Sequence, residues 1–310
     1  METVMTSPHS TDRHQLIVVT GASTGMGAAT ARSLARNGFH VLAGVRRDVD
    51  ADALRAERIE PHILDITVES DVAAIAERVA NDSLRRPLRA LINNAGIAIN
   101  APVETLPMAQ WRKQFEVNLF GHIAMTQALL PALLSSKGTV VNISSVGGKV
   151  VLPTYGAYAG SKFALEAVSD ALRREVGDLG IKVVVVEPGA VKTEMAERGI
   201  ATAEALMTNT TPAQLARYDA LAAAVTAQAR SFGRDGVSAE HAAKVIVKAA
   251  TASRPRTRYT IGRDAAILVR ISRLVSDRVL DFIVRINLRS FAKGSESSEW
   301  HSAPTASADA

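Results

Sequence analysis

The chain has 310 residues, of which 47% are hydrophobic, and it contains no cysteine. This length accommodates one large α/β domain or two small ones, and the lack of cysteine excludes disulfides, thiolate metal sites and cysteine nucleophiles. The net charge is +5, but residues 254–293 carry ten Lys and Arg against three Asp, so the rest of the chain is slightly acidic. Because the positive charge is confined to the C-terminal segment, the pattern argues against a nucleic-acid-binding body and predicts one local anionic partner.

The two ends of the chain are polar. Residues 1–14 contain no apolar core of a secretory signal, and no apolar run of the chain approaches the length needed to span a bilayer. Together with the absence of cysteine, these features lead us to expect a cytoplasmic protein. We also expect residues 1–14 and the tail 294–310 to be disordered.

Short apolar runs alternate with helical patterns along the first 262 residues. Buried parallel strands read as continuous apolar runs, and alternation at this spacing favours right-handed βαβ units. The expected strands are 16–20, 40–45, 62–65, 88–92, 139–145, 181–186 and 258–261. The expected helices are one ending near residue 37, then 50–58, 69–81, 107–136, 157–179 and 238–252, with helices and a flexible lid in 190–236. The sequence therefore predicts a single α/β domain over residues 15–262, a Rossmann-type doubly wound parallel sheet.

Residues 263–293 form a basic, amphipathic helical extension in this interpretation. Charged residues step by three or four along it, and apolar residues lie around the other side. The charged positions are Arg270, Arg273, Asp277, Asp281, Arg285 and Arg289. Two interpretations stay open: residues 264–291 dock on an anionic membrane surface, or they form a helix pair over the substrate pocket or at a subunit contact, which we favour.

A glycine-rich loop, Gly21 to Gly27, follows the first expected strand directly and opens a helix. Glycines let the backbone approach a pyrophosphate, and the helix N-terminus supplies N–H groups and the positive end of a dipole. At the end of the second strand, an acidic residue would accept the ribose 2′-OH, whereas an arginine suits a 2′-phosphate. Val45 occupies the acidic position, and Arg46 and Arg47 follow it. The sequence therefore favours NADP(H) over NAD(H).

Tyr158 and Lys162 are four residues apart on an expected helix, so they share one face. A nearby ammonium favours the phenolate, so we expect Lys162 to lower the pKa of Tyr158. The hydroxyl of Ser145, at the end of the preceding strand, can face the same point. Lone histidines such as His62 and His122 have no partner at metal-ligand spacing, and no metal site is expected.

Six motifs, in this order, resemble the short-chain dehydrogenase/reductase family in its single-domain branch over residues 16–262. They are TGASTGMG at Thr20–Gly27, Asp65, the NNAG of Asn93–Gly96, Asn118, the Ser145–Tyr158–Lys162 set, and Pro188-Gly189 with Thr193. One departure is Thr24, at a loop position that is often basic in NADP(H) members, which leaves Arg46 to hold the phosphate largely alone, with Arg47 as its neighbour. The sequence of the second strand and the C-terminal tail also resemble the steroid- and retinol-dehydrogenase branch of the family.

The resemblance implies an oxidoreductase that interconverts an alcohol and a ketone or aldehyde. Tyr158 would be the general acid/base, Lys162 would lower its pKa and hold the nicotinamide ribose, Ser145 would polarise the substrate oxygen, and Asn118 would support a water relay. The implied cofactor-binding residues are Gly21, Ser23, Thr24, Gly25, Met26, Gly27, Arg46, Arg47, Asp65, Ile66, Asn94, Ala95, Gly96, Tyr158, Lys162, Pro188, Gly189, Val191 and Thr193.

The resemblance also implies a homodimer or homotetramer packed through the helices of 107–136 and 157–179. We expect a lipophilic alcohol or ketone as substrate, since several apolar residues could line a pocket. These are Ile97, Val150, Val151, Leu152 and Met195. Two alternatives remain: a non-catalytic dinucleotide-binding regulator, and a membrane-surface-associated member of the same family.

Overall fold

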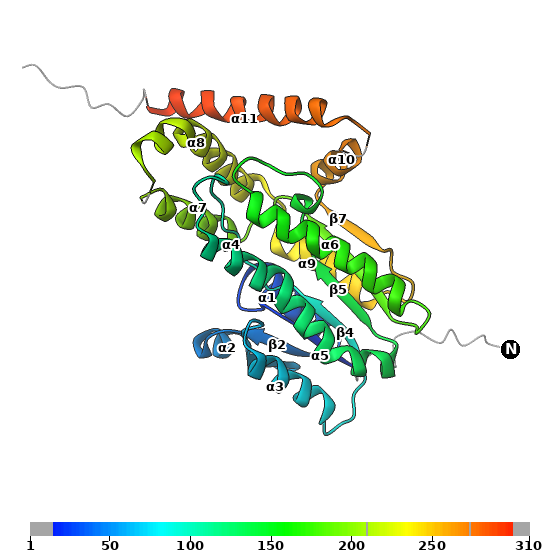
Figure 1. Ribbon diagram of the computed structural model, residues 1–310. Helices are drawn as coiled ribbons and strands as arrows, with labels where there is room; N and C mark the ends of the chain where they lie inside the picture. Colours follow the sequence, from blue (N-terminus) through cyan, green and yellow to red (C-terminus); the bar gives the residue numbers. More distant parts are fainter. Residues whose placement is uncertain (1–14, 209, 273, 300–310) are drawn as a thin grey trace, which may run out of the picture.

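The computed structural model describes residues 15–208, 210–272 and 274–299, and a seven-stranded parallel sheet forms its centre (Figure 1). The strand order is β3-β2-β1-β4-β5-β6-β7. The strands are β1 (Leu16–Val19), β2 (His40–Val45), β3 (Ile59–Ile63), β4 (Leu88–Asn93), β5 (Thr139–Ile143), β6 (Lys182–Pro188) and β7 (Arg258–Ile261). The predicted Rossmann-type, doubly wound sheet is therefore confirmed.

Helices cover both faces of this sheet, because the strands are apolar on both sides. Ile17 and Val19 of β1 pack in one core cluster with α1 and α9, whereas Leu16 and Val18 pack in a second cluster with α3 and α5. The helices are α1 (Gly25–Arg36), α2 (Asp48–Leu54), α3 (Glu69–Ala80), α4 (Met108–Phe115), α5 (Gly121–Ser136), α6 (Gly156–Val176), α7 (Glu194–Met207), α8 (Pro212–Asp235), α9 (Ala239–Thr251), α10 (Arg263–Ile271) and α11 (Asp277–Glu299).

The chain reverses its direction across the sheet between β1 and β4. In sheets of this kind, ligands bind in the crevice outside the carboxyl ends of the strands at such a switch point. The loops that follow β1, β4, β5 and β6 carry most of the predicted site residues, so the topology brings them to one edge of the sheet.

Two elements differ from their expected positions. The third strand begins at Ile59 rather than at residue 62, because Glu60 and Pro61, which look unlike a strand, pair with β2. The single helix expected over 107–136 is divided by a short π-helix, η2 (Glu116–Phe120), between α4 and α5.

This same helical stretch corrects the expectation that no segment is long enough to span a bilayer. Met108–Ser136 has 29 residues and is apolar enough by length and composition. Its residues Met125, Leu129 and Leu133 are fully buried against the sheet in the second core cluster. Its apolarity therefore serves the core of the domain.

The C-terminal extension consists of α10 and α11, and α11 runs along α8 at one end of the molecule (Figure 1). Helix α11 continues to Glu299, so residues 294–299 are helical, in contrast to the disorder expected from residue 294. The other segments expected to be disordered, 1–14 and 300–310, and also Arg273, lie outside the described residues.

A buried network of charges ties α6 to the strands behind it. The Arg258 guanidinium on β7 donates to Glu166 at 3.0 Å and to Asp170 at 3.0 Å, both on α6, and its Nε lies 3.4 Å from Glu187 on β6. Lys149 donates to Glu166 at 2.8 Å. The side chains of Glu166 and Glu187 are only 6% and 2% exposed, so the network places two carboxylates where they depend on these cations.

We expect Arg258→Gln to destabilise the protein by about 3 kcal/mol at pH 8, since it leaves two buried carboxylates short of a cation. Burial and the neighbouring Glu166 already raise the pKa of Glu187, so this group takes up a proton readily as the pH falls. The difference between variant and wild type should therefore narrow toward pH 5. Chemical denaturation at both pH values measures the free energy of unfolding. The matched control is Arg173→Gln, which removes a part-exposed ion pair with Asp170. Equal losses of unfolding free energy in the two variants would contradict the proposed role of the network.

Candidate active site

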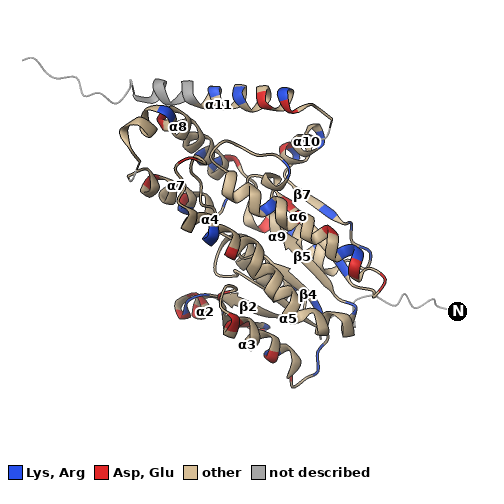
Figure 2. Cartoon of the chain, viewed as in Figure 1, with Lys and Arg blue, Asp and Glu red and all other residues tan. Residues whose placement is uncertain are grey.

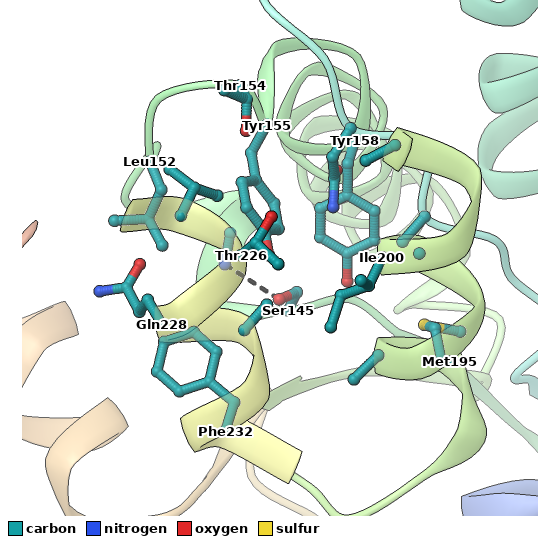
Figure 3. Close-up of a pocket in the computed structure, with 18 of the residues that line it drawn as sticks. Ser145, Leu152, Thr154, Tyr155, Tyr158, Met195, Ile200, Thr226, Gln228 and Phe232 are labelled. Carbon is teal, nitrogen blue, oxygen red and sulfur yellow. Dashed lines mark hydrogen bonds between the residues drawn. The ribbon is translucent and has the colours of Figure 1, made fainter. Parts of the chain in front are cut away.

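Ser145, Tyr158 and Lys162 come together at the carboxyl end of β5. Ser145 lies two residues after the end of β5, and its Oγ accepts a hydrogen bond from the amide of Gly147 at 3.0 Å. Tyr158 and Lys162 lie one turn apart on α6. Figure 3 shows the Tyr158 ring standing in the pocket above Ser145, with its hydroxyl on the side of Ser145 and Ile200. The three residues that the sequence singled out therefore share one site.

The protonation of this set differs from the sequence expectation. Burial raises the pKa of Tyr158, and the side chain of Ser145 offsets part of this rise. Lys162 is buried, and its Nζ donates to the carbonyl of Ile143 at 2.8 Å. Burial lowers the pKa of Lys162 to about 8, although the charge of Glu166, one turn further on, acts in the opposite direction and raises it. The expectation that Lys162 lowers the pKa of Tyr158 is not met in this structure, because the ammonium is directed at the end of β5.

Two neighbouring residues of the same types, Ser144 and Tyr155, lie beside Ser145 and Tyr158. Ser144 is buried, and a Cβ placed on Gly148 would lie 2.8 Å from its Oγ, so this hydroxyl is packed against the turn, whereas the side chain of Ser145 lowers the pKa of the Tyr158 phenol. Tyr155 stands edge-on to Tyr158 with ring centroids 6.1 Å apart. Burial raises the pKa of Tyr155 to about 12, and the residue four positions further on is Ala159 rather than a lysine.

Asn118 lies on the π-helix η2, where its amide clamps the loop after β4. Its Oδ1 accepts from the amide of Ile97 at 2.9 Å, and its Nδ2 donates to the carbonyl of the same residue at 2.9 Å. One turn further on, the His122 Nε2 donates to the carbonyl of Ala95 at 2.7 Å, and burial lowers the pKa of His122 to about 3. Both side chains hold the NNAG backbone in place, a role for His122 that sequence reasoning missed.

The glycine loop has the close approaches that a pyrophosphate site needs. Gly21 and Gly25 have φ values of +62° and +54°, and a Cβ on Gly27 would lie 2.2 Å from the carbonyl oxygen of Gly21. Asn94 supports the loop from the side, because its Nδ2 donates to the carbonyls of Thr20 and Gly21. The N-cap residue Thr24 makes no side-chain bond to the first turn of α1, so the described residues leave those amides available to an anion. The loop fits a dinucleotide.

Three arginines gather near the position where an adenosine phosphate would lie. Arg47 is engaged in a two-point ion pair with Asp50, with both N–O distances 2.7 Å, whereas Arg46 is exposed and forms no ion pair with any described residue. Arg198 on α7 reaches the glycine loop, where its Nη2 donates to Thr24 Oγ1 at 3.4 Å. Arg46 and Arg198 both lower the pKa of Asp50 through their charge. Sequence reasoning missed Arg198, because α7 lies far from the loop along the chain.

The remaining predicted cofactor residues lie in three places. Seven of them line the main cavity: Met26, Asn94, Gly96, Pro188, Gly189, Val191 and Thr193. Asp65 and Ile66 lie at the far side, after β3. The Asp65 carboxylate accepts from the backbone and hydroxyl of Thr67, and Ile66 is buried against Gly121. Neither residue lines the main cavity. Ser23 and Ala95 belong to the glycine loop and to the turn packed against it.

The cavity has a volume of about 530 Å³ and is mostly apolar. Tyr158 and Ser145 lie in its wall, and α7 and α8 face them from the opposite side with Met195, Ile200 and Phe232 (Figure 3). Of the apolar residues expected in a pocket, Ile97, Val150, Leu152 and Met195 line it, and Val151 does not: 47% of its surface is exposed. Helix α11 closes one side with Ile283, Val284 and Asn287, and a position over the pocket is one that the sequence analysis favoured for the C-terminal extension.

Known proteins resemble this chain over most of its length. A profile of the short chain dehydrogenase family matches residues 15–204. The chain is 33% identical to 3-amino-tetrahydro-pyrrolizinone reductase of Xenorhabdus hominickii, over 86% of this chain and 93% of that protein. It is 31% identical to NADPH-dependent 3-dehydrocapnine reductase of Ornithobacterium rhinotracheale, over 90% and 99%, and 37% identical to retinol dehydrogenase 7 of Mus musculus, over 84% and 83%.

A solved structure shares the fold with low sequence identity. It is a short chain dehydrogenase from Burkholderia cenocepacia in complex with NADP, with a TM-score of 0.65 and 26% identity over 85% of this chain and 94% of that one. The sequence match and the shared fold agree with the glycine loop and the Ser145–Tyr158–Lys162 arrangement. The chain belongs to the short-chain dehydrogenase family of oxidoreductases.

Proposed function

We propose that the protein is an NADP(H)-dependent oxidoreductase that interconverts an alcohol and a ketone or aldehyde on a lipophilic substrate. The observation that carries this proposal is the position of the Tyr158 and Ser145 hydroxyls together in the wall of a mostly apolar cavity. This point lies at the carboxyl ends of β5 and β6, where dinucleotides bind in doubly wound sheets.

The proposed proton chemistry follows from the two hydroxyls. In reduction, Tyr158 donates its phenolic proton to the substrate oxygen, and in oxidation it takes that proton back. Because burial raises the pKa of Tyr158, the phenol is protonated at neutral pH and suited to the reductive direction. Ser145 donates a hydrogen bond to the same oxygen and stabilises the charge that develops there. A nicotinamide dinucleotide, when bound, supplies or accepts the hydride.

Lys162 and Asn118 act behind the phenol in this proposal. The amine of Lys162 keeps a proton at neutral pH, since its pKa is about 8, and it can exchange the carbonyl of Ile143 for the ribose hydroxyls of the cofactor. Asn118 fixes the loop after β4 through Ile97 and supports a water relay toward Lys162.

NADP(H) rather than NAD(H) is proposed on the charge around the loop after β2. Arg46 is exposed without an ion-pair partner among the described residues, and Arg198 approaches the same region from α7. Val45, at the position where an acidic residue would accept a ribose 2′-OH, is instead buried in the core. The relative from Ornithobacterium rhinotracheale is NADPH-dependent by its name, which supports the same choice.

A lipophilic substrate is proposed on the lining of the cavity and on the similarity to a retinol dehydrogenase.

We also propose a homodimer or homotetramer that forms through α5 and α6, since exposed apolar side chains on this face would be covered there. Phe120, Leu134 and Phe163 are 54%, 37% and 42% exposed. Light scattering of the purified chain measures this; a monomer at all concentrations would contradict it.

The role of Tyr158 is tested by Tyr158→Phe. We expect the variant to lose at least about 99% of its turnover with any carbonyl substrate, because the proton donor is gone, whereas binding of NADPH remains. Initial rates across a panel of carbonyls and fluorescence titration with NADPH measure the two properties. Tyr155→Phe is the matched control and should keep most of the turnover. Substantial turnover in Tyr158→Phe would contradict the assignment, and absence of turnover in the wild type would favour a non-catalytic regulator.

The cofactor assignment is tested by Arg46→Ala and Arg198→Ala. We expect Arg46→Ala to lower the ratio of kcat/KM for NADPH over NADH by about tenfold to a hundredfold, since it removes a charged hydrogen bond to the 2′-phosphate. Arg198→Ala should lower it by about threefold to tenfold, because its exposed guanidinium is also engaged in an ion pair with Glu194 at 3.3 Å. Arg32→Ala, which removes an exposed arginine from α1, is the control. An unchanged ratio in Arg46→Ala would rule out the proposed phosphate contact.

The substrate class is tested by Ala222→Phe on α8, which adds a benzyl-sized volume to the cavity wall. We expect kcat/KM to fall by about tenfold or more for a long-chain methyl ketone and by less than about threefold for butanone. Steady-state kinetics with both ketones measures the effect. Equal losses for the two substrates would show that the cavity does not hold the chain of the substrate.

A further inference from the structure

The outer side of α10, α11 and their connection carries an unusual number of exposed apolar side chains. Leu274 is 86% exposed, Phe282 61%, Ile267 56% and Ile286 51%. Ile271 and Val279 add to the same segment, at 37% and 45%. Large apolar side chains exposed together over a short segment mark an interaction site rather than ordinary surface.

Helix α11 has two apolar sides, and only one of them contacts the protein. Leu280, Val284 and Leu288, spaced by four, are the less exposed ones and face the domain. Val279, Phe282 and Ile286 are spaced by three and four on a different side, which is exposed. Since Val284 already lines the cavity and Phe282 does not, the exposed stripe is not needed to close the pocket.

Arginines border this exposed stripe. Arg278, Arg285 and Arg289 follow one another by seven and four residues along the neighbouring side of α11, and Arg263 and Arg270 lie on the exposed side of α10. None of these five forms an ion pair with any residue that the structure describes. Figure 2 shows the basic residues of α10 and α11 at one end of the molecule, beyond α8. An apolar stripe flanked by arginines is the pattern of a helix that lies in a membrane interface.

A second copy of the chain suits this surface poorly. A two-fold contact would place the same patch on both subunits, so five arginines of one copy would face five of the other, with Asp264, Asp277 and Asp281 on each copy to offset only part of their charge. The exposed apolar face of α5 and α6 is a separate surface, and it remains free for subunit contacts. An anionic lipid surface, by contrast, complements both the charge and the apolar stripe.

We propose that α10 and α11 dock the protein on the surface of an anionic lipid bilayer. Phe282, Ile286 and Leu274 insert among the acyl chains near the headgroups, and the arginines contact lipid phosphates. Docking turns this end of the molecule toward the bilayer. Since Ile283 and Val284 line the cavity from the same helix, one wall of the cavity then lies beside the lipid. Delivery of a lipophilic substrate by this route rests on the proposed function, whereas the docking itself does not.

Co-sedimentation of the full chain with vesicles tests the docking. We expect binding to phosphatidylcholine vesicles that contain about a quarter phosphatidylserine, weak binding to phosphatidylcholine alone, and a loss of binding as salt is raised. Because enzymatic activity plays no part in this measurement, its outcome does not depend on the proposed reaction.

Two variants separate the apolar from the basic contribution. Phe282→Ser with Ile286→Ser should lower the partition coefficient by about tenfold or more, since two inserted side chains are lost. Arg278→Gln, Arg285→Gln and Arg289→Gln together should lower it by about a hundredfold, from the loss of three charges near the surface. The matched controls are Leu84→Ser, at a 70% exposed leucine outside this surface, and Arg32→Gln with Arg36→Gln on α1. Both should bind as the wild type does, and the thermal unfolding temperature of each variant shows that it is folded.

Three results would overturn the proposal. The wild type could fail to sediment with the anionic vesicles at low salt. The two α11 variants could bind as tightly as the controls, which would place the contact elsewhere. Third, the wild type could fail to bind vesicles while the Phe282→Ser, Ile286→Ser variant has a different oligomeric state by light scattering. That result would make the surface a subunit interface.

Discussion

The buried hydrogen bond from the Lys162 amine to the carbonyl of Ile143 joins the helix that carries Tyr158 to the end of β5. Helix α6 contacts β6, and its residues Ala159, Ser161 and Leu165 are fully buried. The ammonium fixes one point of α6 against the sheet edge. Arg258 and Lys149 fix a second point further along the helix through Glu166. The place of the phenol in the cavity follows from these two attachments.

The same attachments explain the protonation of the site. The Lys162 amine is directed to Ile143 and lies one turn from Glu166, and its charge contributes to the low pKa of His122. Burial then keeps the pKa of Tyr158 high, and only Ser145 opposes it. A sequence shows that a phenol and an amine share a helix face, but it does not show which acceptor the amine donates its hydrogen bond to. Ligands that compete for the amine, such as ribose hydroxyls, would change this balance.

The sequence was sufficient for the sheet and for the residues at the ends of its strands, because both depend on local patterns: apolar runs, glycines after β1, and the fixed step from Tyr158 to Lys162. It was insufficient where contacts join distant segments. The approach of Arg198 to Thr24 spans 174 positions. The π-helix that aims Asn118 at Ile97 has no distinct composition, and Glu60 and Pro61 conceal the start of β3. These features are fixed by packing rather than by propensity.

The C-terminal extension shows how one pattern can satisfy two contacts. The sequence offered two alternatives for it, a cover over the pocket or a surface for an anionic membrane. In the structure, Leu280, Val284 and Leu288 lie against the domain on one side of α11, while Phe282 and Ile286 remain exposed beside arginines that form no ion pair with a described residue. A helix that only covered a pocket would gain nothing from a second apolar stripe and would be more soluble without it. The two alternatives are therefore compatible, since they use different sides of the same helix.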